Sequence, residues 1–273
     1  MNIHVRGSGL IPENAAFETV AVRWVRHWNE HLFSFAVDRP ASFRFRSGEF
    51  VMIGLPGIDS PKPVMRAYSI ASPAYSDELE FLSIKVPGGP LTGRLQAIHA
   101  GDQLYLARKP TGTLVCDALL GGQRLWLLST GTGLAPFLSL TRDPEVYDRF
   151  GQVIVVHGAR RVSDLAYHDE LTSQLAGDPL VGDQALLQMH YLPTVTREPF
   201  HTAGRITDLI GDGRLFGAPV AGPRGFDPEI DRVMLCGSTA MIRETADLLD
   251  AAGLVEGSNA NPGHYVIERA FVG

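Results

Sequence analysis

The stretch Ser129-Thr130-Gly131-Thr132-Gly133-Leu134-Ala135-Pro136-Phe137 decides the fold of the second half of this chain. The apolar residues 124–129 before it predict a buried strand, and residues 134–140 predict a helix. Glycines at such a junction let the backbone approach a phosphate closely, and free N–H groups at a helix start attract negative charge. The stretch therefore predicts a phosphate cradle, with a tight strand-to-helix turn that binds nothing as the alternative.

The sequence around this cradle alternates apolar runs with helix-length segments, which predicts parallel strands joined by crossover helices. Pro136 stands where the common fingerprint G-x-G-x-x-G would have its third glycine, and it suits the first turn of a helix. We expect a doubly wound α/β domain. Its strands are predicted at residues 124–129, 153–157, 185–191, 232–236 and 265–272, its helices at 134–140, 165–175, 206–210 and 239–252, and a surface loop at 217–228.

Arginines follow the next predicted strand, where an NAD-binding unit usually presents an acid to the ribose hydroxyls. Arg160 and Arg161 end that strand, and Arg197 and Arg205 follow further along the chain. A guanidinium matches a phosphate bidentately, so the cluster predicts a site for the 2′-phosphate of NADP. The sequence leaves open whether Arg160 or Arg161 is the main ligand. The alternative is a set of surface ion pairs with Asp164, Asp169, Glu170 or Glu198.

The first half of the chain has a different pattern of short, alternating or aromatic-rich runs separated by turns, which predicts antiparallel strands. We expect a Greek-key β-barrel. Its strands are predicted at residues 19–28, 32–37, 43–55, 65–70, 79–86 and 103–107, with a helical connection near 91–97. The change of pattern near residues 115–123 predicts two domains, residues 1–117 and 118–273.

Composition limits the possible functions. The chain has 273 residues, 45% hydrophobic and 20% charged, which excludes a disordered or fibrous protein. No apolar run approaches the roughly 20 residues of a membrane span, and the N-terminus shows no secretory signal, so we expect a cytoplasmic protein without membrane contact. A net charge of −6 argues against nucleic acid as a partner.

Cysteine usage restricts the redox chemistry. The two cysteines, Cys116 and Cys236, cannot supply the four ligands of an iron–sulfur cluster or a zinc knot, and no other metal-binding spacing occurs. We predict no metal site, and any redox chemistry must come from an organic cofactor. Cys116 is expected to be a small packing residue, and His157 a core histidine rather than a base.

Two motifs of the first half carry groups that suit a flavin nucleotide. Arg66-Ala67-Tyr68-Ser69 supplies a guanidinium, an aromatic face and a hydroxyl. Ile84-Lys85-Val86 leads into the turn Gly89-Pro90-Leu91-Thr92 before the predicted helix. Such groups can hold a pyrophosphate and stack on a flavin ring. Tyr68 as an ordinary strand aromatic and the glycines as an ordinary turn remain the alternatives.

Six motifs in order resemble the bacterial ferredoxin/flavodoxin–NADP⁺ reductases of the plant-type fold, and the resemblance spans residues 17–273. The motifs are Arg66-Ala67-Tyr68-Ser69, Gly89-Pro90-Leu91-Thr92, Lys109-Pro110-Thr111-Gly112-Thr113-Leu114, Ser129 to Phe137, Met234-Leu235-Cys236-Gly237 and Val266-Ile267-Glu268-Arg269-Ala270-Phe271-Val272. The sequence departs from many relatives at Ser238-Thr239 after the Cys-Gly turn, and Ala270 stands where the plant enzymes end on an aromatic residue. The three residues after Ala270 resemble the tail of the bacterial subgroup.

The resemblance implies an FAD-binding barrel, an NADP-binding α/β domain and a flavin ring between them. Arg66 would contact the pyrophosphate, Tyr68 would stack on the flavin, and Ser69 would reach its N5. The FAD site would comprise Arg66, Ala67, Tyr68, Ser69, Ile84, Lys85, Val86, Gly89, Pro90, Leu91, Thr92, Thr132, Ala270 and Phe271. The NADP site would comprise Thr132, Gly133, Arg160, Arg161, Arg197, Arg205, Cys236 and Gly237. Ser69, Cys236, Glu268 and Ala270 would take part in catalysis.

The implied function is electron exchange between NADPH and a one-electron carrier, ferredoxin or flavodoxin, through hydride transfer to flavin N5. A same-fold alternative is an NAD(P)H:flavin reductase or the reductase component of an oxygenase. An alternative of another class is a non-catalytic nucleotide-sensing or electron-relay subunit. We expect a monomer, with Lys62, Arg66 and Arg94 at the rim of a basic patch that receives the acidic carrier.

Overall fold

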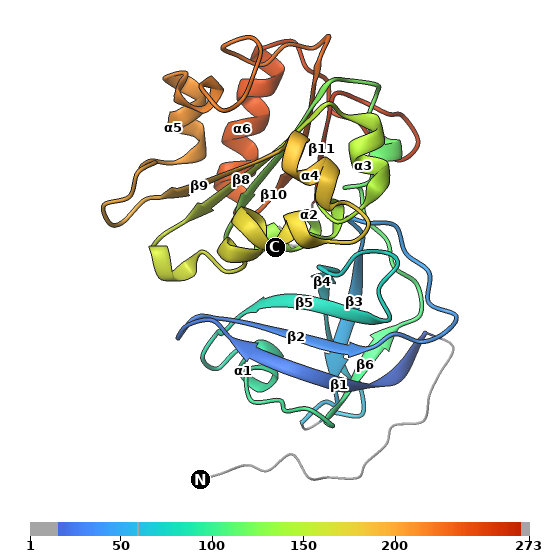
Figure 1. The fold of residues 1–273 in the computed structure, drawn as a ribbon. Helices are drawn as coiled ribbons and strands as arrows, with labels where there is room; N and C mark the ends of the chain where they lie inside the picture. Colours follow the sequence, from blue (N-terminus) through green and yellow to red (C-terminus); the bar gives the residue numbers. More distant parts are fainter. Residues whose placement is uncertain (1–15, 59, 269–273) are drawn as a thin grey trace.

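A computed structural model describes residues 16–58 and 60–268 and places two β-sheets in separate layers of the molecule (Figure 1). The first sheet is antiparallel and has the strand order β4-β3-β6-β1-β2-β5. Its strands are β1 (Phe17–His27), β2 (Leu32–Asp38), β3 (Phe50–Leu55), β4 (Val64–Ser69), β5 (Glu78–Ile84) and β6 (Gln103–Ala107).

The antiparallel sheet closes on itself as a barrel. An isolated bridge between Ile70 and Phe81 joins the two edge strands, so that the sheet has no open edge at this point. Alternate residues such as Phe33 and Phe35 point inward and are fully buried in one hydrophobic cluster. The short helix α1 (Thr92–Leu95) packs Leu95 into the same cluster.

The second sheet is parallel, with the order β11-β10-β7-β8-β9. Its strands are β7 (Arg124–Thr130), β8 (Gln152–Ala159), β9 (Met189–Val195), β10 (Asp231–Cys236) and β11 (Tyr265–Ile267). The chain builds outward from β7 in one direction through β8 and β9, and in the other through β10 and β11. The topological switch point, where ligands bind in open α/β sheets, therefore lies between β7 and β10.

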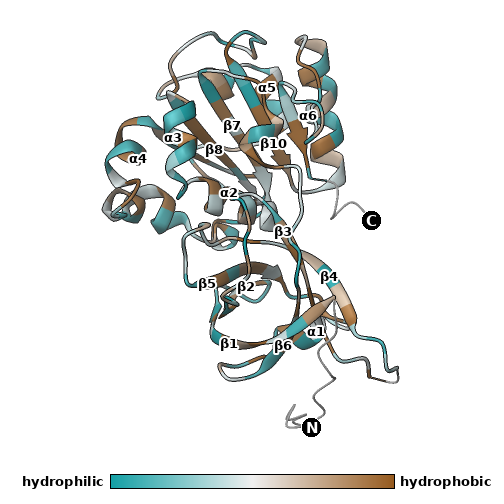
Figure 2. Ribbon diagram, turned by 90° about the vertical axis from the view of Figure 1, so that its right-hand side faces the viewer, coloured by the Kyte–Doolittle hydropathy of each residue, from teal (hydrophilic) through white to brown (hydrophobic). Residues whose placement is uncertain are grey.

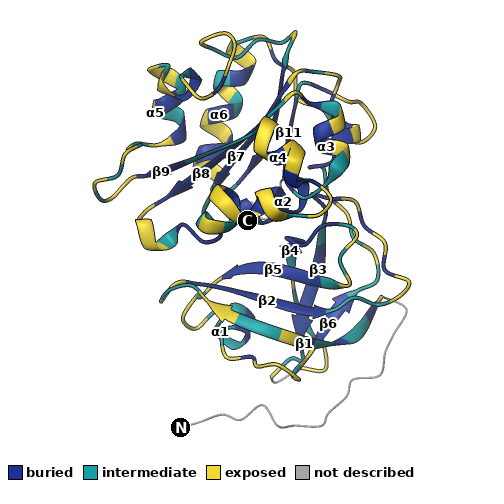
Figure 3. Ribbon diagram, in the orientation of Figure 1, coloured by how far each residue is buried: buried dark blue, intermediate teal, exposed yellow. Residues whose placement is uncertain are grey.

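Helices cover both faces of the parallel sheet (Figures 1 and 2). Leu125 and Leu127 pack toward one helical layer, whereas Trp126 and Leu128 pack toward the other. The central strands β7, β8 and β10 between these layers are almost entirely buried (Figure 3). The layers are α2 (Ala135–Leu140), α3 (Pro144–Arg149) and α4 (Gly182–Gln188) on one face, and α5 (Ile206–Gly211) and α6 (Thr239–Ala251) on the other. The predicted barrel followed by a doubly wound sheet is confirmed.

The helix predicted at residues 165–175 begins only at His168 and has an irregular geometry. Tyr167 has φ +61°, a left-handed conformation that a helix cannot contain. The helical run that follows it continues as the π-helical turn η4 (Glu170–Gln174) and the 3₁₀ turn η5 (Leu175–Gly177). Contacts of the Tyr167 side chain outside its own segment override the apolar periodicity of this stretch.

The strand predicted at residues 185–191 is also wrong in its first half. Ala185 belongs to α4, and β9 begins only at Met189. Leu186 and Leu187, whose apolar character suggested a strand, lie on the exposed side of that helix, with 72% and 80% of their surface accessible. The barrel strand predicted from residue 43 begins only at Phe50.

One helix, α3, was not predicted, although its start signal is local. The Asp143 side chain accepts a hydrogen bond of 3.0 Å from the Glu145 N–H, and Pro144 occupies the first turn. In the part of the chain that the structure describes, no helix has the length and apolar character needed to cross a membrane.

Candidate functional site

Two turns meet at the carboxyl edge of the parallel sheet, at its switch point. Ser129 of β7 and Cys236 of β10 are register partners, so the turns that follow them start side by side. The Ser238 N–H donates a 2.9 Å hydrogen bond to Thr130 Oγ1, which ties one turn to the other. These contacts make the predicted cradle and the Cys-Gly turn one structural unit.

The glycines of these turns are needed for different reasons. A Cβ on Gly133 would lie 2.3 Å from the Cys236 carbonyl oxygen, and one on Gly237 would lie 2.2 Å from Thr130 Oγ1. Close packing therefore accounts for both residues. Gly131 has φ +56° with open space around it, and Thr132 next to it is half-buried. This open part of the cradle is where a ligand can approach the backbone.

Cys236 and Glu268 lie buried at this edge, with 2% and 4% of their surface exposed. The Glu268 N–H donates to the Leu235 carbonyl at 3.1 Å. Burial, followed by the Glu268 charge, raises the pKa of Cys236 well above its usual range, so the side chain remains a neutral thiol. Glu268 is therefore not the solvated side chain that an ordinary last strand would carry.

The barrel reaches this edge through the stretch that joins the two domains. Thr113 Oγ1 donates to the Ile267 carbonyl at 2.5 Å, and the Thr113 N–H lies 3.5 Å from Glu268 Oε2. Two residues earlier, Thr111 bridges Phe50, the register partner of Ser69. The end of the strand that carries Ser69 and the Glu268 carboxylate therefore belong to one connected junction.

Gly112 and Asn259 were not predicted as parts of this junction. Asn259 Nδ2 donates to the Gly112 carbonyl at 2.9 Å, and Gly112 has φ +152°. A Cβ on Gly112 would lie 3.2 Å from Glu49 Cα and 3.3 Å from Glu268 Oε2, so the position is tightly packed, and its φ favours glycine. The contact joins residues far apart in sequence, and no local signal announces it.

The Arg-Ala-Tyr-Ser motif lies at the end of β4. Arg66 is exposed and donates to the neighbouring Met65 carbonyl, Ala67 is half-buried, and Ser69 is buried. Tyr68 is 7% exposed, its ring packs edge-on against two core phenylalanines, and its hydroxyl lies 3.3 Å from Ser83 Oγ. Burial raises its pKa. Tyr68 thus has the packing of a strand aromatic.

The turn after β5 presents mainly backbone. Ile84 and Val86 are exposed, and Lys85 Nζ donates to the Asn29 carbonyl at 2.6 Å. A Cβ on Gly89 would lie 2.5 Å from Thr92 Oγ1, so this turn is closely packed around glycine. Pro90 is exposed, whereas the Leu91 side chain is buried in the barrel core. Leu91 can face a ligand only with its backbone.

The four predicted phosphate arginines lie together at the carboxyl edge, and all four are exposed. The Arg197 N–H donates to the Arg160 carbonyl at 2.9 Å, which places these two residues side by side. Arg161 follows directly, and Arg205 precedes α5 after a turn that bonds back to Val195. The structure brings all four to one end of β8 and β9.

The nearby acids are engaged elsewhere. Asp164 accepts from the backbone N–H of Arg161, Glu198 accepts from the backbone N–H of Val162, and Glu170 pairs with Arg26. Within the described residues, no carboxylate forms an ion pair with the guanidinium of any of the four arginines. The alternative of surface ion pairs is therefore wrong here.

The remaining single residues behave as packing elements. His157 is 1% exposed with Nδ1 3.1 Å from the Tyr191 hydroxyl, and burial lowers its pKa to about 4. Cys116 is buried in the main core cluster, and burial raises its pKa to about 12. Both agree with the predicted core roles. Ala270 and Phe271 lie outside the described residues, and among those described no group of three or more His, Cys, Asp or Glu side chains could hold a metal ion.

A barrel joined to a doubly wound sheet, with a glycine cradle at the switch point, defines a two-domain nucleotide-binding oxidoreductase. Residues 20–115 match the family described as an oxidoreductase FAD-binding domain, and residues 127–247 match an oxidoreductase NAD-binding domain.

Relatives at high identity over nearly the whole chain name the family. The chain is 52% identical over 264 residues to a flavodoxin/ferredoxin–NADP reductase of Rhodobacter capsulatus, covering 97% of each chain. It is 54% identical to a ferredoxin–NADP reductase of Pseudomonas aeruginosa, covering 93% of this chain and 97% of the relative. A solved ferredoxin NADP⁺ reductase of Neisseria gonorrhoeae, with bound FAD and NADP, matches with a TM-score of 0.82 and 29% identity over 93% of this chain and 99% of the other. The chain belongs to the ferredoxin/flavodoxin–NADP reductase family.

Proposed function

We propose that this protein is an FAD-dependent reductase that exchanges electrons between NADPH and ferredoxin or flavodoxin. The observation that carries the proposal is the group of four arginines without carboxylate partners beside the switch-point cradle. Uncompensated guanidinium groups at a nucleotide site suit a substrate with an extra phosphate, as NADPH has and NADH lacks. When bound, FAD supplies the conversion between the two-electron chemistry of a hydride and the one-electron chemistry of a carrier.

The α/β domain binds the pyridine nucleotide in this proposal. Arg160, Arg161, Arg197 and Arg205 hold the 2′-phosphate, with the first two sharing the contact. The backbone of Thr132 and Gly133 faces the nicotinamide end, and Cys236 and Gly237 line its other side. The fit rests on the open space at Gly131 and on the close junction of both turns, which fixes the backbone before a ligand arrives.

The barrel binds FAD in this proposal. Arg66 is exposed and keeps donors free for a pyrophosphate, and the backbone of Gly89 to Thr92 lies at the start of α1. Tyr68 offers the flavin part of its ring, while its edge contacts keep that ring fixed. Ala67, Ile84, Lys85 and Val86 flank these groups, and Ala270 and Phe271 remain predicted contacts.

Buried polar groups near the flavin edge take the catalytic positions. Cys236 stays a neutral thiol and so presents a polarizable, uncharged surface to the nicotinamide. Glu268 keeps its place through Gly112 and Thr113, from where it orients the nicotinamide or moves a proton between solvent and the site. Ser69, at the end of β4, donates its hydroxyl toward the flavin.

The same proposal includes the organisation predicted from sequence: a domain boundary at residues 117 and 118, a monomer, and a cytoplasmic location. The carrier docks on the barrel side, where Lys62, Arg66 and Arg94 supply positive charge. Lys62 and Arg66 are exposed, whereas the Arg94 guanidinium donates to the Pro56 carbonyl at 2.6 Å and supplies charge from a fixed position.

Anaerobic stopped-flow with the purified protein tests the proposal. We expect the flavin absorbance to bleach on mixing with NADPH. The reduced protein should then pass electrons rapidly to ferredoxin or flavodoxin. No bleaching would favour a sensing or relay subunit. Faster reduction of free FMN or FAD than of either carrier would favour a flavin reductase.

A further inference from the structure

Tyr167 has the one positive φ angle found among the described non-glycine residues. Such a conformation costs on the order of 1–3 kcal/mol and persists only where the surrounding structure imposes it. The residue is 2% exposed and lies in the loop after β8, between Arg161 and η4. Contacts of its side chain must therefore hold this backbone.

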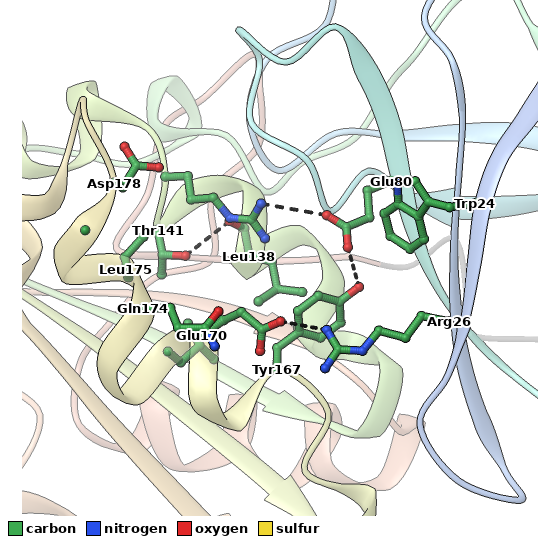
Figure 4. Close-up of a pocket in the computed structure, with 13 residues that line it drawn as sticks. Trp24, Arg26, Glu80, Leu138, Thr141, Tyr167, Glu170, Gln174, Leu175 and Asp178 are labelled. Carbon is green, nitrogen blue, oxygen red and sulfur yellow. Dashed lines mark hydrogen bonds and ion pairs between the residues drawn. The ribbon is translucent and has the colours of Figure 1, made fainter.

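The Tyr167 side chain crosses from the α/β domain into the barrel. Its hydroxyl oxygen lies 2.5 Å from Ser34 Oγ on β2 and 2.6 Å from Glu80 Oε1 on β5, and Figure 4 shows the contact with Glu80. Trp28 packs its ring against the tyrosine ring, with centroids 4.6 Å apart, and donates from Nε1 to Ser34 Oγ at 2.8 Å. One side chain thus contacts two barrel strands and the end of a third.

One hydrogen-bond network joins the side chains of Trp28, Ser34, Tyr167 and Glu80. The indole only donates, the carboxylate accepts, and the two hydroxyls between them can each do both, so every member has a partner. Arg142, after α2, lies 3.7 Å from the second Glu80 oxygen and supplies the positive charge. Ser34 and Glu80 are both buried, so the loss of one partner leaves the others unsatisfied in a place of low dielectric.

Other polar links between the same two surfaces are more exposed. The Arg26–Glu170 ion pair has 54% and 26% of its side chains accessible, and exposed pairs of this kind contribute about 0–1 kcal/mol. Tyr75 reaches Asp178 at 3.2 Å, also at the surface. A cavity of about 500 Å³ lies among these groups and is bordered by Arg26, Glu80, Tyr167, Glu170 and Asp178 (Figure 4). Tyr167 is therefore the buried anchor of this part of the junction.

The anchor lies close in the chain to the proposed NADP site, and contacts through Asn29 link it to the proposed FAD site. Tyr167 follows Arg161 by six residues, and the intervening turn is held by Asn29, whose Nδ2 donates to the Ser163 carbonyl at 2.7 Å. The Asn29 carbonyl in turn accepts from Lys85, in the turn after β5. Asn29 therefore links the stretch before Tyr167 to the barrel turn, so a shift of the Tyr167 loop would change how the α/β domain lies against the barrel.

We propose that Tyr167 is a positioning residue: through Ser34 and Glu80 it fixes the α/β domain against the barrel, so that the nicotinamide meets the flavin at the distance that hydride transfer needs. The inference rests on the proposed function. Tyr167 touches neither reacting group, and its effect is transmitted through the relative placement of the two domains.

Tyr167→Phe in the FAD-loaded protein tests the inference, because it keeps the ring and removes only the hydroxyl. We expect the rate of flavin reduction by NADPH to fall about tenfold or more, since small misplacements of reacting groups cost up to about 10²-fold. The KM for NADPH and the FAD content should change little, because β-pairing at Ala159 and Val195 holds the arginines. Amide exchange at His168 and Leu171 should accelerate in both the loaded and the FAD-free protein.

Tyr147→Phe is the matched control. Tyr147 is buried and its hydroxyl donates at 2.6 Å to the Thr141 carbonyl, but this bond stays within the α/β domain. It should lower thermal stability to a similar degree and leave hydride transfer unchanged. Ser34→Ala breaks the same network from the barrel side, so it should slow hydride transfer too, and the double variant with Tyr167→Phe should be little worse than either single variant.

These outcomes distinguish the proposed function from the positioning role of Tyr167. A wild-type protein that NADPH does not reduce would overturn the proposed function and the positioning role with it. A reducible wild type with Tyr167→Phe equal to it in rate and in exchange would overturn the positioning role alone. Equal slowing by Tyr147→Phe would assign the effect to lost stability and would also overturn it.

Discussion

The parallel sheet carries arginines at both of its edges, and the two sets differ in what surrounds them. At the amino edge, Arg124 is 1% exposed and binds Asp231 through Nε and Nη2, both at 2.7 Å. Its remaining donors reach the carbonyls of Ala221, Pro223 and Gly225. At the carboxyl edge, Arg160 and Arg197 are exposed and no described carboxylate pairs with them.

The comparison shows that the surroundings of an arginine, and not the residue type, decide whether its guanidinium has donors available for a ligand. Arg124 uses its donors on the loop that joins η6 (Arg214–Phe216) to β10, and Asp231 also accepts from the Trp126 indole and the Asp227 N–H. A buried charge so completely paired has nothing left for a ligand. The carboxyl-edge arginines keep donors available, because the Asp164 and Glu198 carboxylates accept hydrogen bonds from backbone N–H groups instead.

The largest expected effect comes from breaking the buried pair. Arg124→Ala leaves the fully buried Asp231 without its counter-charge, so we expect a loss of about 3–5 kcal/mol in the free energy of unfolding. Chemical denaturation measures it, with the KM for NADPH unchanged in the protein that still folds. Arg149→Ala, which removes two more exposed ion pairs, with Asp117 and Glu145, should cost at most about 1 kcal/mol. An equal loss of unfolding free energy in the Arg124 and Arg149 variants would show that burial of the ion pair makes no difference.

His157 is a buried base without an oppositely charged partner among the described residues, and it provides a second test of the comparison. The one side-chain partner found for His157 is the neutral Tyr191 hydroxyl, and burial lowers its pKa to about 4 from an unfolded value near 6.5. The unfolded chain then binds the extra proton between these values, so stability falls as pH drops from 6.5 to 4. The expected loss is about 3 kcal/mol from this group. Denaturation against pH measures it, with His157→Gln as the control that should lack this part of the slope.

Local signals predicted most of the strands and the turns that follow them, although β3 and β9 begin later than predicted. The strands that carry the cradle were predicted because their apolar runs end at glycine turns. The positive φ of Gly131 and the close contact of Gly133 with the Cys236 carbonyl are apparent only in the structure. Arg160 and Arg161 were singled out because they end a predicted strand, at the place where an NAD-binding unit usually presents an acid.

Non-local contacts account for what was missed. Tyr167 leaves the helical pattern because Ser34 and Glu80, more than eighty residues away, bind its hydroxyl. The acids that seemed able to neutralise the arginines turn out to cap turns, as Asp164 does for Arg161. The exposed Leu186 and Leu187 of α4 mimic a buried strand, since a short apolar run fits either element.

Replacing an arginine of the carboxyl edge should weaken ligand binding without lowering the stability of the fold. Arg197→Ala or Arg160→Ala deletes one charge-assisted hydrogen bond, worth about 1.5–3 kcal/mol, so we expect the KM for NADPH to rise by about ten- to a hundredfold. The KM for NADH should stay nearly the same, and the melting temperature should not move. Arg243→Ala, an exposed arginine of α6, is the control. Equal losses with both nucleotides would mean that the cluster does not read the 2′-phosphate.

The smallest expected effect belongs to a buried acid whose partner is a backbone amide. Glu268 is 4% exposed, faces the Thr113 N–H and lies close enough to Cys236 to raise the pKa of that thiol. Glu268→Gln keeps the size and an acceptor oxygen while removing the charge, so the fold should tolerate it. If the carboxylate orients the nicotinamide or moves a proton, hydride transfer should slow by about fivefold, the equivalent of roughly 1 kcal/mol in the barrier.

Glu244→Gln is the matched control, because Glu244 is an exposed acid of α6 in the same domain. Stopped-flow reduction with NADPH and with its deuterated form should show the slower step only in the Glu268 variant, with the isotope effect retained because hydride transfer is still the step observed. The Cys236 thiol should meanwhile titrate with a lower pKa in that variant, since a negative neighbour has been removed. A wild-type rate together with a lowered thiol pKa would show that the charge reaches Cys236 but takes no part in the reaction.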